Sequence, residues 1–192
     1  MRGRRPAGTP HAAQVQGAPD QGEEAARLRA ELERLDRTRL RWLARSLARV
    51  YDGQDWWPGR GPFEICIGAI LVQNTSWNGA ARAIEAMRGR RLLEPGRLAA
   101  ARHPSLQAAV RPAGCFRQKA RRLKIFARWW MGAGGLAGLR EIPTDALRGR
   151  LLALHGIGPE TADCILLYAL GRPVFVVDAY TRRLLARLGL AA

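Results

Sequence analysis

The sequence predicts an all-α domain preceded by an extension of different composition. From residue 37 onward, apolar residues recur at helical spacing, and glycines and prolines interrupt them at the intervals where helices end. No segment shows the alternation of a half-buried strand, and the short apolar run 174–177 is interpreted as a buried connection. The roughly 155 residues that follow residue 36 are enough to bury a substantial core.

The extension covers residues 1–36. Residues 1–22 are rich in Gly, Pro, Ala, Gln and Arg without hydrophobic periodicity, which predicts disorder. No apolar run follows the first arginines, so this is not a secretory signal. Residues 23–36 contain strong helix formers with leucines at helical spacing, and they favour either an extension of the next helix or a short exposed one. The second domain is therefore predicted to span residues 37–192.

Eight helices separated by Gly and Pro breaks are expected in this domain. They span residues 37–51, 62–73, 78–88, 95–109, 116–131, 144–153, 159–170 and 179–189. The second is expected to be buried, because it carries Ile65, Ile67 and Ile70. The fifth has one strongly basic face that could lie along phosphates, although such residues are more often scaffold or solvated surface.

The charge of the chain indicates a polyanionic partner. It carries 32 Lys and Arg against 16 Asp and Glu, a net charge of +16. Residues 1–36 hold six arginines and six acidic residues, so the whole excess falls in residues 37–192. A field of one sign favours nucleic acid without specifying a sequence. A membrane span is excluded, because no segment has the ~20 apolar residues that a span requires.

A glycine turn at Gly156 and Gly158 is expected to separate two helices. Glycines allow a sharp turn that leaves backbone N–H groups uncovered, and Pro159 then suits the first position of a helix. An anion is therefore favoured beside residues 158–161. The alternative is an ordinary turn between helices, since a Gly-x-Gly pair alone is a weak signal.

Asp178 follows the apolar run 174–177 and lies 17 residues after Thr161. That length accommodates a helix, a break at 171–173 and the apolar run, so Asp178 is expected to return near the glycine turn. The alternative role is an N-cap of the helix 179–189, which does not exclude catalysis.

Residues 151–183 strongly resemble the helix-hairpin-helix DNA glycosylases of the endonuclease III superfamily. The residues in register with that family's signature are Leu154, Gly156, Ile157, Gly158, Thr161, Ala162, Pro173, Val177, Asp178 and Arg183. The resemblance implies that the hairpin, including Gly156, Ile157, Gly158 and Thr161, binds the DNA backbone. It also implies that Asp178 drives cleavage of the N-glycosidic bond.

Glu160 stands where the bifunctional members of that family carry a lysine. An amine is needed to form a Schiff base with the sugar, and a carboxylate cannot do so. The only lysines, Lys119 and Lys124, lie upstream in the basic helical stretch. The resemblance therefore implies a monofunctional enzyme, in which Asp178 stabilises the developing positive charge and orients or deprotonates a water molecule.

Residues 64–84 resemble a second block of the same family. There the resemblance assigns to Gln73 the filling of the gap that an extruded base leaves in the duplex. It implies that Trp77 stacks on the flipped base, as in the branch that excises alkylated purines such as 3-methyladenine. A core or helix-packing role for Trp77 is the alternative. Glu160 belongs to the same expected base pocket, where it could attract a cationic base or bridge to an arginine.

The chain ends 14 residues after Asp178, whereas the family continues through helices that pack with the N-terminal helix and commonly carry a four-cysteine iron–sulfur cluster. The expected fold is thus the two-lobed helical glycosylase fold without its C-terminal helices and iron–sulfur loop. Cys66, Cys115 and Cys164 show no cluster spacing, so no metal and no cofactor are expected, and the thiols are expected to be reduced and mostly buried.

The leading hypothesis is a DNA glycosylase of base-excision repair that acts on a damaged, alkylated base in double-stranded DNA. It would be a bacterial cytoplasmic protein associated with the nucleoid, with no membrane contact and no identifiable protein partner. The alternative is a non-catalytic DNA-binding remnant of an endonuclease III-like protein. Asp178 favours the enzyme, and the short C-terminus favours the remnant. A lyase activity would require a lysine supplied from elsewhere.

Overall fold

The computed structural model describes Ala30, residues 37–51 and residues 57–190, which form helices and connecting loops without a strand. The predicted all-α fold class is confirmed. Apart from Ala30, which is helical, the predicted extension 1–36 lies outside the described residues. None of the described helices is long and apolar enough to cross a membrane.

The described helices follow one another in short segments. They are α2 (Arg37–Tyr51), α3 (Pro62–Leu71), α4 (Trp77–Gly89), α5 (Pro95–Ala100), α6 (His103–Val110), the 3-10 turn η1 (Arg111–Ala113), α7 (Phe116–Gly132), α8 (Gly135–Glu141), α9 (Thr144–Leu152), α10 (Pro159–Cys164), the π-helical turn η2 (Ile165–Ala169) and α11 (Ala179–Arg187).

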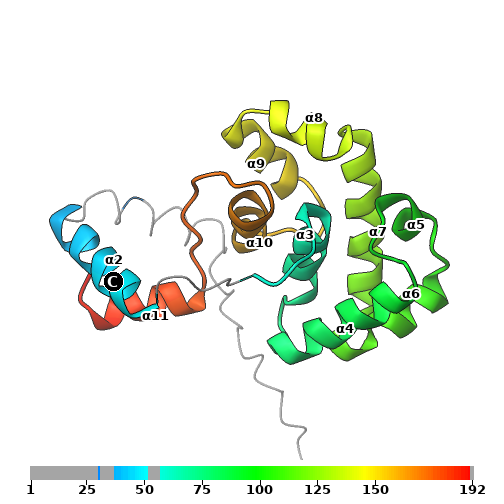
Figure 1. The fold of residues 1–192 in the computed structure, drawn as a ribbon, viewed down its shortest axis with the longest axis horizontal. Helices are drawn as coiled ribbons and strands as arrows, with labels where there is room; N and C mark the ends of the chain where they lie inside the picture. Colours follow the sequence, from blue (N-terminus) through cyan, green and yellow to red (C-terminus); the bar gives the residue numbers. More distant parts are fainter. Residues whose placement is uncertain (1–29, 31–36, 52–56, 191–192) are drawn as a thin grey trace, which may run out of the picture.

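The helices form a large group, α3 to η2, and a smaller pair, α2 and α11 (Figure 1). The extended segment 171–178 leads from η2 to α11 and so connects the two groups. Within the large group, α3 packs against α4, α7, α10 and η2, and α7 packs against α5 and α6. The helices α3 and α7 therefore lie at the centre of the domain.

The core is built on α3 and α7. Cys66, Ile67 and Ile70 of α3 are fully buried, as are Ala120 and Leu123 of α7. Removing a side chain the size of Ile or Leu from water stabilises a fold by about 1.5–3 kcal/mol. The expectation that α3 is buried is confirmed, and burial raises the pKa of the Cys66 thiol far above its usual range.

Two expectations about the helices are wrong. A single helix over 95–109 does not form, because the backbone is extended at Ala101 and Arg102 between α5 and α6. Pro104 explains the break, since its ring would clash with the carbonyl of Ala100 and it has no N–H to bond there. No helix was expected over 135–141, where α8 forms after Gly134 and Gly135 turn the chain with positive φ angles of 80° and 65°.

Two further expectations need correction. The predicted helices 62–73 and 179–189 end earlier, at Leu71 and Arg187. The three thiols are not alike, because Cys66 is buried, Cys164 is half-buried and Cys115 is exposed, and all three are free.

Lys119 is a buried cation of α7 with backbone carbonyls as its partners. Its Nζ donates to the Leu71 carbonyl at 2.9 Å and to the Ala113 carbonyl at 2.6 Å. Leu71 is the last residue of α3, so the ammonium neutralises the partial negative charge of that helix end. Burial lowers the pKa of Lys119. One side chain thus holds the end of α3 and η1 against α7.

Substitution Lys119→Met should lower the free energy of unfolding by about 2 kcal/mol, because it leaves two buried carbonyls without a donor. Denaturant unfolding followed by circular dichroism measures this change. Arg128→Met is the matched control, since Arg128 is exposed on the same helix and its loss should change stability by no more than about 0.5 kcal/mol. Equal losses of unfolding free energy in the two variants would show that the net charge of α7, and not the hydrogen bonds of Lys119, affects stability.

Candidate functional site

The turn between α9 and α10 is a hairpin whose two glycines differ in conformation. Gly156 has a φ of +85°, which L-residues rarely adopt, whereas Gly158 is extended with a φ of −91°. Ile157 is buried, and its N–H donates to the Leu154 carbonyl at 3.0 Å. The hairpin is therefore anchored by Ile157 and turns at Gly156.

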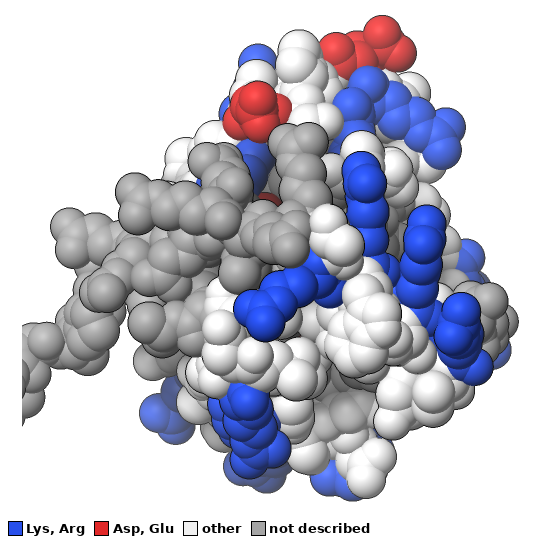
Figure 2. Space-filling view, turned by 90° about the vertical axis from the view of Figure 1, so that its left-hand side faces the viewer, with Lys and Arg blue, Asp and Glu red and all other residues white. Residues whose placement is uncertain are grey.

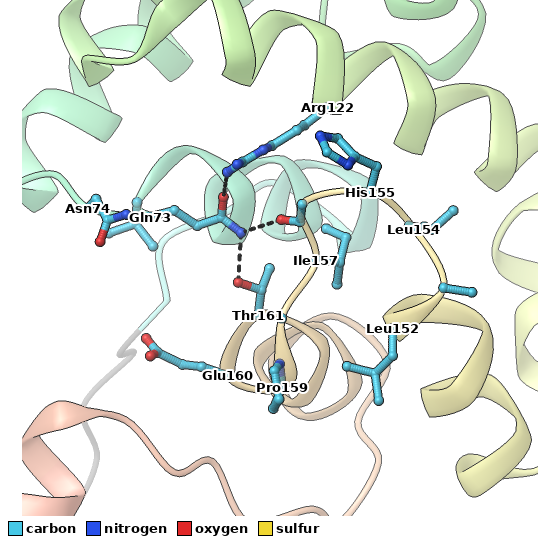
Figure 3. Close-up of a pocket in the computed structure, with 14 residues that line it drawn as sticks. Gln73, Asn74, Arg122, Leu152, Leu154, His155, Ile157, Pro159, Glu160 and Thr161 are labelled. Carbon is cyan, nitrogen blue, oxygen red and sulfur yellow. Dashed lines mark hydrogen bonds between the residues drawn. The ribbon is translucent and has the colours of Figure 1, made fainter. Parts of the chain in front are cut away.

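A pocket of about 730 Å³ lies between this hairpin and the loop after α3 (Figure 3). Its walls are the hairpin residues 152–161 and, from elsewhere in the sequence, Val72, Gln73, Asn74 and Arg122. The structure thus brings together the predicted DNA-binding residues Gly156, Ile157, Gly158, Thr161 and Gln73 in one place.

Gln73 lies across this pocket with its side-chain amide fully used. Its Nε2 donates to the Gly156 carbonyl and to the Thr161 hydroxyl, both at 2.9 Å (Figure 3). Its Oε1 accepts a hydrogen bond from Arg122 Nη1 at 2.7 Å. Gln73 is half-buried, while its neighbour Asn74 is exposed and has a φ of +49°. The filling of a duplex gap by Gln73 stays a prediction.

Arg122 is a residue of this site that sequence reasoning assigned only to a basic face. It reaches from α7 over the hairpin, and a Cβ at Gly156 would overlap its Nε and Cδ atoms. Its Nε is buried without a hydrogen-bond partner among the described residues. The sequence held no signal that separates Arg122 from the other basic residues of this helix, because the burial of Lys119, one turn earlier, is known only from the structure.

Asp178 forms the N-cap of α11. Its Oδ1 accepts a hydrogen bond from the Thr181 N–H at 2.7 Å, and its side chain is half-buried. The alternative of an N-cap role is therefore confirmed. The cap engages one carboxylate oxygen, so it is compatible with a chemical role for the other.

Glu160 and Asp178 influence each other electrostatically. Partial burial raises the pKa of Glu160, the negative charge of Asp178 adds to that effect, and Arg182 opposes it. Cys164 experiences the same neighbourhood: burial raises the pKa of its thiol to about 12, with smaller contributions from Glu160, Asp178 and Asp163. The expectation that Asp178 returns near the hairpin helix is confirmed, because Glu160 is in the first turn of α10.

Trp57, Trp77 and Tyr168 form an aromatic cluster. The Trp57 ring stacks on Tyr168 with 5.2 Å between centroids and meets the edge of Trp77 at 5.4 Å. Glu160, Cys164 and Tyr168 follow at four-residue intervals along α10 and η2, so Glu160 lies on the same side of this segment as Tyr168 of the aromatic cluster. Trp77 is 37% exposed, so the alternative that it is a core residue is wrong. It does pack on Trp57.

Sequence reasoning did not include Trp57 or Tyr168 among the site residues. Tyr168 belongs to a π-helical turn, and such turns occur often at functional sites. No group of three or more His, Cys, Asp or Glu residues that could hold a metal occurs among residues 37–51 and 57–190. That no cofactor is needed stays a prediction.

Comparisons with known proteins show the family of the chain. The family model described as "HhH-GPD superfamily base excision DNA repair protein" matches residues 67–192. The fold is thus that of a superfamily of base-excision DNA repair proteins with a helix-hairpin-helix. The chain belongs to the HhH-GPD superfamily.

Two curated relatives illustrate the extent of the match. A putative DNA repair glycosylase of Methanocaldococcus jannaschii is 43% identical over 146 residues, which cover 74% of this chain and 66% of that protein. The endonuclease III of Thermotoga maritima is 30% identical over 132 residues, which cover 67% of this chain and 57% of that protein. The chain spans about two thirds or less of the length of these relatives.

Solved structures show the same fold. The H. pylori 3-methyladenine DNA glycosylase bound to 1,N6-ethenoadenine is similar with a TM-score of 0.65 and 31% identity, over 71% of this chain and 66% of that one. A non-covalent endonuclease III–DNA complex is similar with a TM-score of 0.64 and 25% identity, over 81% of this chain and 70% of that one. The expected resemblance to endonuclease III is confirmed.

Alanine substitutions of the two hairpin glycines should have different effects. Gly156→Ala should lower the free energy of unfolding by about 1–3 kcal/mol, because a Cβ is disfavoured at this φ and overlaps Arg122. Gly158→Ala is the matched control: its φ is negative and no atom lies within 4 Å of an added Cβ. Denaturant unfolding of both variants is the measurement, and a larger loss for Gly158→Ala would contradict this account of the hairpin.

Proposed function

We propose that the chain is a monofunctional DNA glycosylase, which hydrolyses the N-glycosidic bond of a damaged base in double-stranded DNA. The observation that carries the proposal is that the negative charges of Asp178 and Glu160 act on each other at the start of the helix that follows the hairpin, where Glu160 stands in place of an amine. The chemistry needs an anionic group where the sugar becomes positively charged, and a surface that receives the extruded base.

The hairpin and the basic surface support binding of duplex DNA. The family match and the structural similarity to an endonuclease III–DNA complex point to the same partner. Figure 2 shows one face on which most of the visible charged side chains are Lys or Arg. In this proposal the hairpin residues Gly156, Ile157, Gly158 and Thr161 bind the backbone, and Gln73 fills the gap left by the base.

Asp178 is the residue assigned to the reaction. Its carboxylate would stabilise the oxocarbenium charge that develops as the base leaves, and would orient or deprotonate the attacking water. The hydrogen bond from the Thr181 N–H fixes the orientation of this carboxylate.

The monofunctional assignment rests on the positions of the amines as well as on Glu160. Lys119 donates to two carbonyls within the core, and Lys124 donates to the Ala101 carbonyl at 2.5 Å. Both ammonium groups are therefore buried and hydrogen-bonded to backbone carbonyls of segments that pack against α7. Neither is placed as a nucleophile for the sugar.

The aromatic cluster favours a purine with an alkylated, electron-poor ring. Trp77 is exposed at the mouth of the cluster and could stack on such a base, with Trp57 and Tyr168 behind it. The carboxylate of Glu160 would attract a cationic base. The H. pylori relative, a 3-methyladenine DNA glycosylase, is bound to 1,N6-ethenoadenine, which supports this substrate class.

A second candidate function is DNA binding without catalysis. It is favoured by one observation: the N-cap of α11 accounts for Asp178 without any chemical role. In that case the hairpin would bind duplex DNA, and the carboxylate would only stabilise the helix.

Substitution Asp178→Asn separates the two candidates. Asparagine is as good an N-cap as aspartate, so the fold should be retained while excision falls by about 10²–10⁴-fold. Single-turnover excision and duplex affinity are measured on the same variant. Asp145→Asn, in the exposed first turn of α9, is the control and should excise at the wild-type rate. Unchanged excision in Asp178→Asn would remove Asp178 from the mechanism.

Incubation with duplexes that each carry one lesion tests the reaction type. With 1,N6-ethenoadenine, strand breaks should appear only after alkali treatment, and borohydride should trap no covalent complex. Glu160→Lys should produce a trapped complex, because it supplies the missing amine. Breaks without alkali in the wild-type chain would refute monofunctional action.

A duplex with mismatched thymine tests the substrate class, since a 31% identical relative from Aeropyrum pernix is a thymine-DNA glycosylase. Excision of thymine alone would refute the alkylated-base assignment.

A further inference from the structure

Arg122 joins two parts of the site that are distant in sequence. Its Nη1 donates to Gln73 Oε1 at 2.7 Å, and its side chain passes so close to Gly156 that a Cβ there would overlap it. Its Nε is buried in the same place without a hydrogen-bond partner among the described residues. Arg122 as a whole is half-buried, and its terminal nitrogens can bind a ligand with oxygen acceptors.

Gln73 is held back from the surface by this arginine. Both amide hydrogens are used by the hairpin, at the Gly156 carbonyl and the Thr161 hydroxyl, and the amide oxygen is used by Arg122. A side chain that fills a gap in a duplex has to leave the protein surface. Figure 3 shows Gln73 pointing toward the hairpin instead, so the conformation in the free protein is a retracted one.

We propose that Arg122 is a phosphate-binding residue that keeps Gln73 retracted in the free protein and releases it when DNA binds. A phosphate oxygen of the duplex would enter the pocket and replace Gln73 Oε1 on the guanidinium. The amide of Gln73 would then leave the hairpin and enter the duplex. This inference rests on the proposed function, because it assumes a duplex at the hairpin, and it adds a positioning residue to it.

Charge favours the replacement of Gln73 Oε1 by a phosphate oxygen on the Arg122 guanidinium. Arg122 now binds a neutral amide through Nη1, whereas a phosphate offers an anion and two oxygens, so it can bond both terminal nitrogens together. The pocket of about 730 Å³ between the hairpin and the loop after α3 leaves room for the phosphate.

The movement should be confined to the side chain of Gln73. Lys119, one turn earlier on α7, holds the Leu71 carbonyl at 2.9 Å, two residues before Gln73. Ser76 caps α4 through a hydrogen bond from the Gly79 N–H at 3.3 Å. The loop is therefore fixed at both ends, and no rearrangement of α3 or α4 is needed.

The side-chain amide of Gln73 reports on the proposal directly. In nuclear magnetic resonance spectra of the full chain, its protons should exchange slowly with water in the free protein. They should lose that protection when a short duplex with a tetrahydrofuran abasic-site analogue is added. In Arg122→Met the free protein should already show faster exchange. Protection that persists in the DNA complex would overturn the release of Gln73.

Affinity for the same duplex tests the phosphate contact. Arg122→Met should weaken binding about tenfold, because one phosphate contact is lost. For the same reason the slope of log affinity against log salt concentration should become shallower by about one unit. Arg97→Met is the matched control, since Arg97 lies on α5 and pairs with Glu94 at 2.7 Å. Arg122→Lys keeps the charge without the planar fork, and it should recover the salt dependence but only part of the affinity. An unchanged salt dependence in Arg122→Met would overturn the proposal.

These measurements do not depend on excision. If the duplex binds and Gln73 is released while no lesion is excised, the inference stands and the glycosylase assignment fails. If the duplex binds and Gln73 stays protected, the inference alone fails. If no duplex binds, both are refuted.

Discussion

Lys119 donates from the core of the domain to the last carbonyl of α3 and to a carbonyl of η1, and the geometry of the site depends on this contact. An ammonium at the carbonyl end of a helix is favourable, and its burial makes the position of the helix end well defined. The loop that begins there carries Gln73. One turn further along α7, Arg122 holds the side chain of that glutamine. Two cations on one side of one helix thus align the loop with the hairpin.

The hairpin is adapted to the same arrangement. Gly156 needs a positive φ to make the turn, and the missing Cβ leaves the space through which Arg122 passes. Its carbonyl accepts a hydrogen bond from Gln73, so the residue that turns the chain also connects the hairpin to α3. A substitution at this glycine would therefore affect the turn, the arginine and the glutamine together. Gly158 carries none of these constraints, since its φ is negative and no atom lies within 4 Å of an added Cβ.

After the hairpin, one side of α10 and η2 carries Glu160 at its start and Tyr168 at its end. Trp57 stacks on Tyr168, and the edge of Trp77 meets Trp57. The π-helical turn changes the register of the last residues of the segment and so sets the direction of Tyr168. Asp178 comes to this place through an extended segment and is fixed by capping α11. These elements provide a carboxylate and aromatic rings on which a flat ring can stack.

The sequence by itself determined the all-α fold class, the hairpin, the return of Asp178 to it and the family. The fold class and the hairpin follow from glycine positions and helical periodicity, which are local properties, whereas the family follows from the resemblance of residues 151–183 to its signature. It did not show the break at Ala101 and Arg102, nor that Lys119 is a buried cation. Only the tertiary structure decided that Arg122 and Gln73 meet over Gly156, and that Trp57 stacks on Tyr168. These contacts join residues more than 45 positions apart, and their geometry depends on how α3, α7 and α10 pack, which no local pattern encodes.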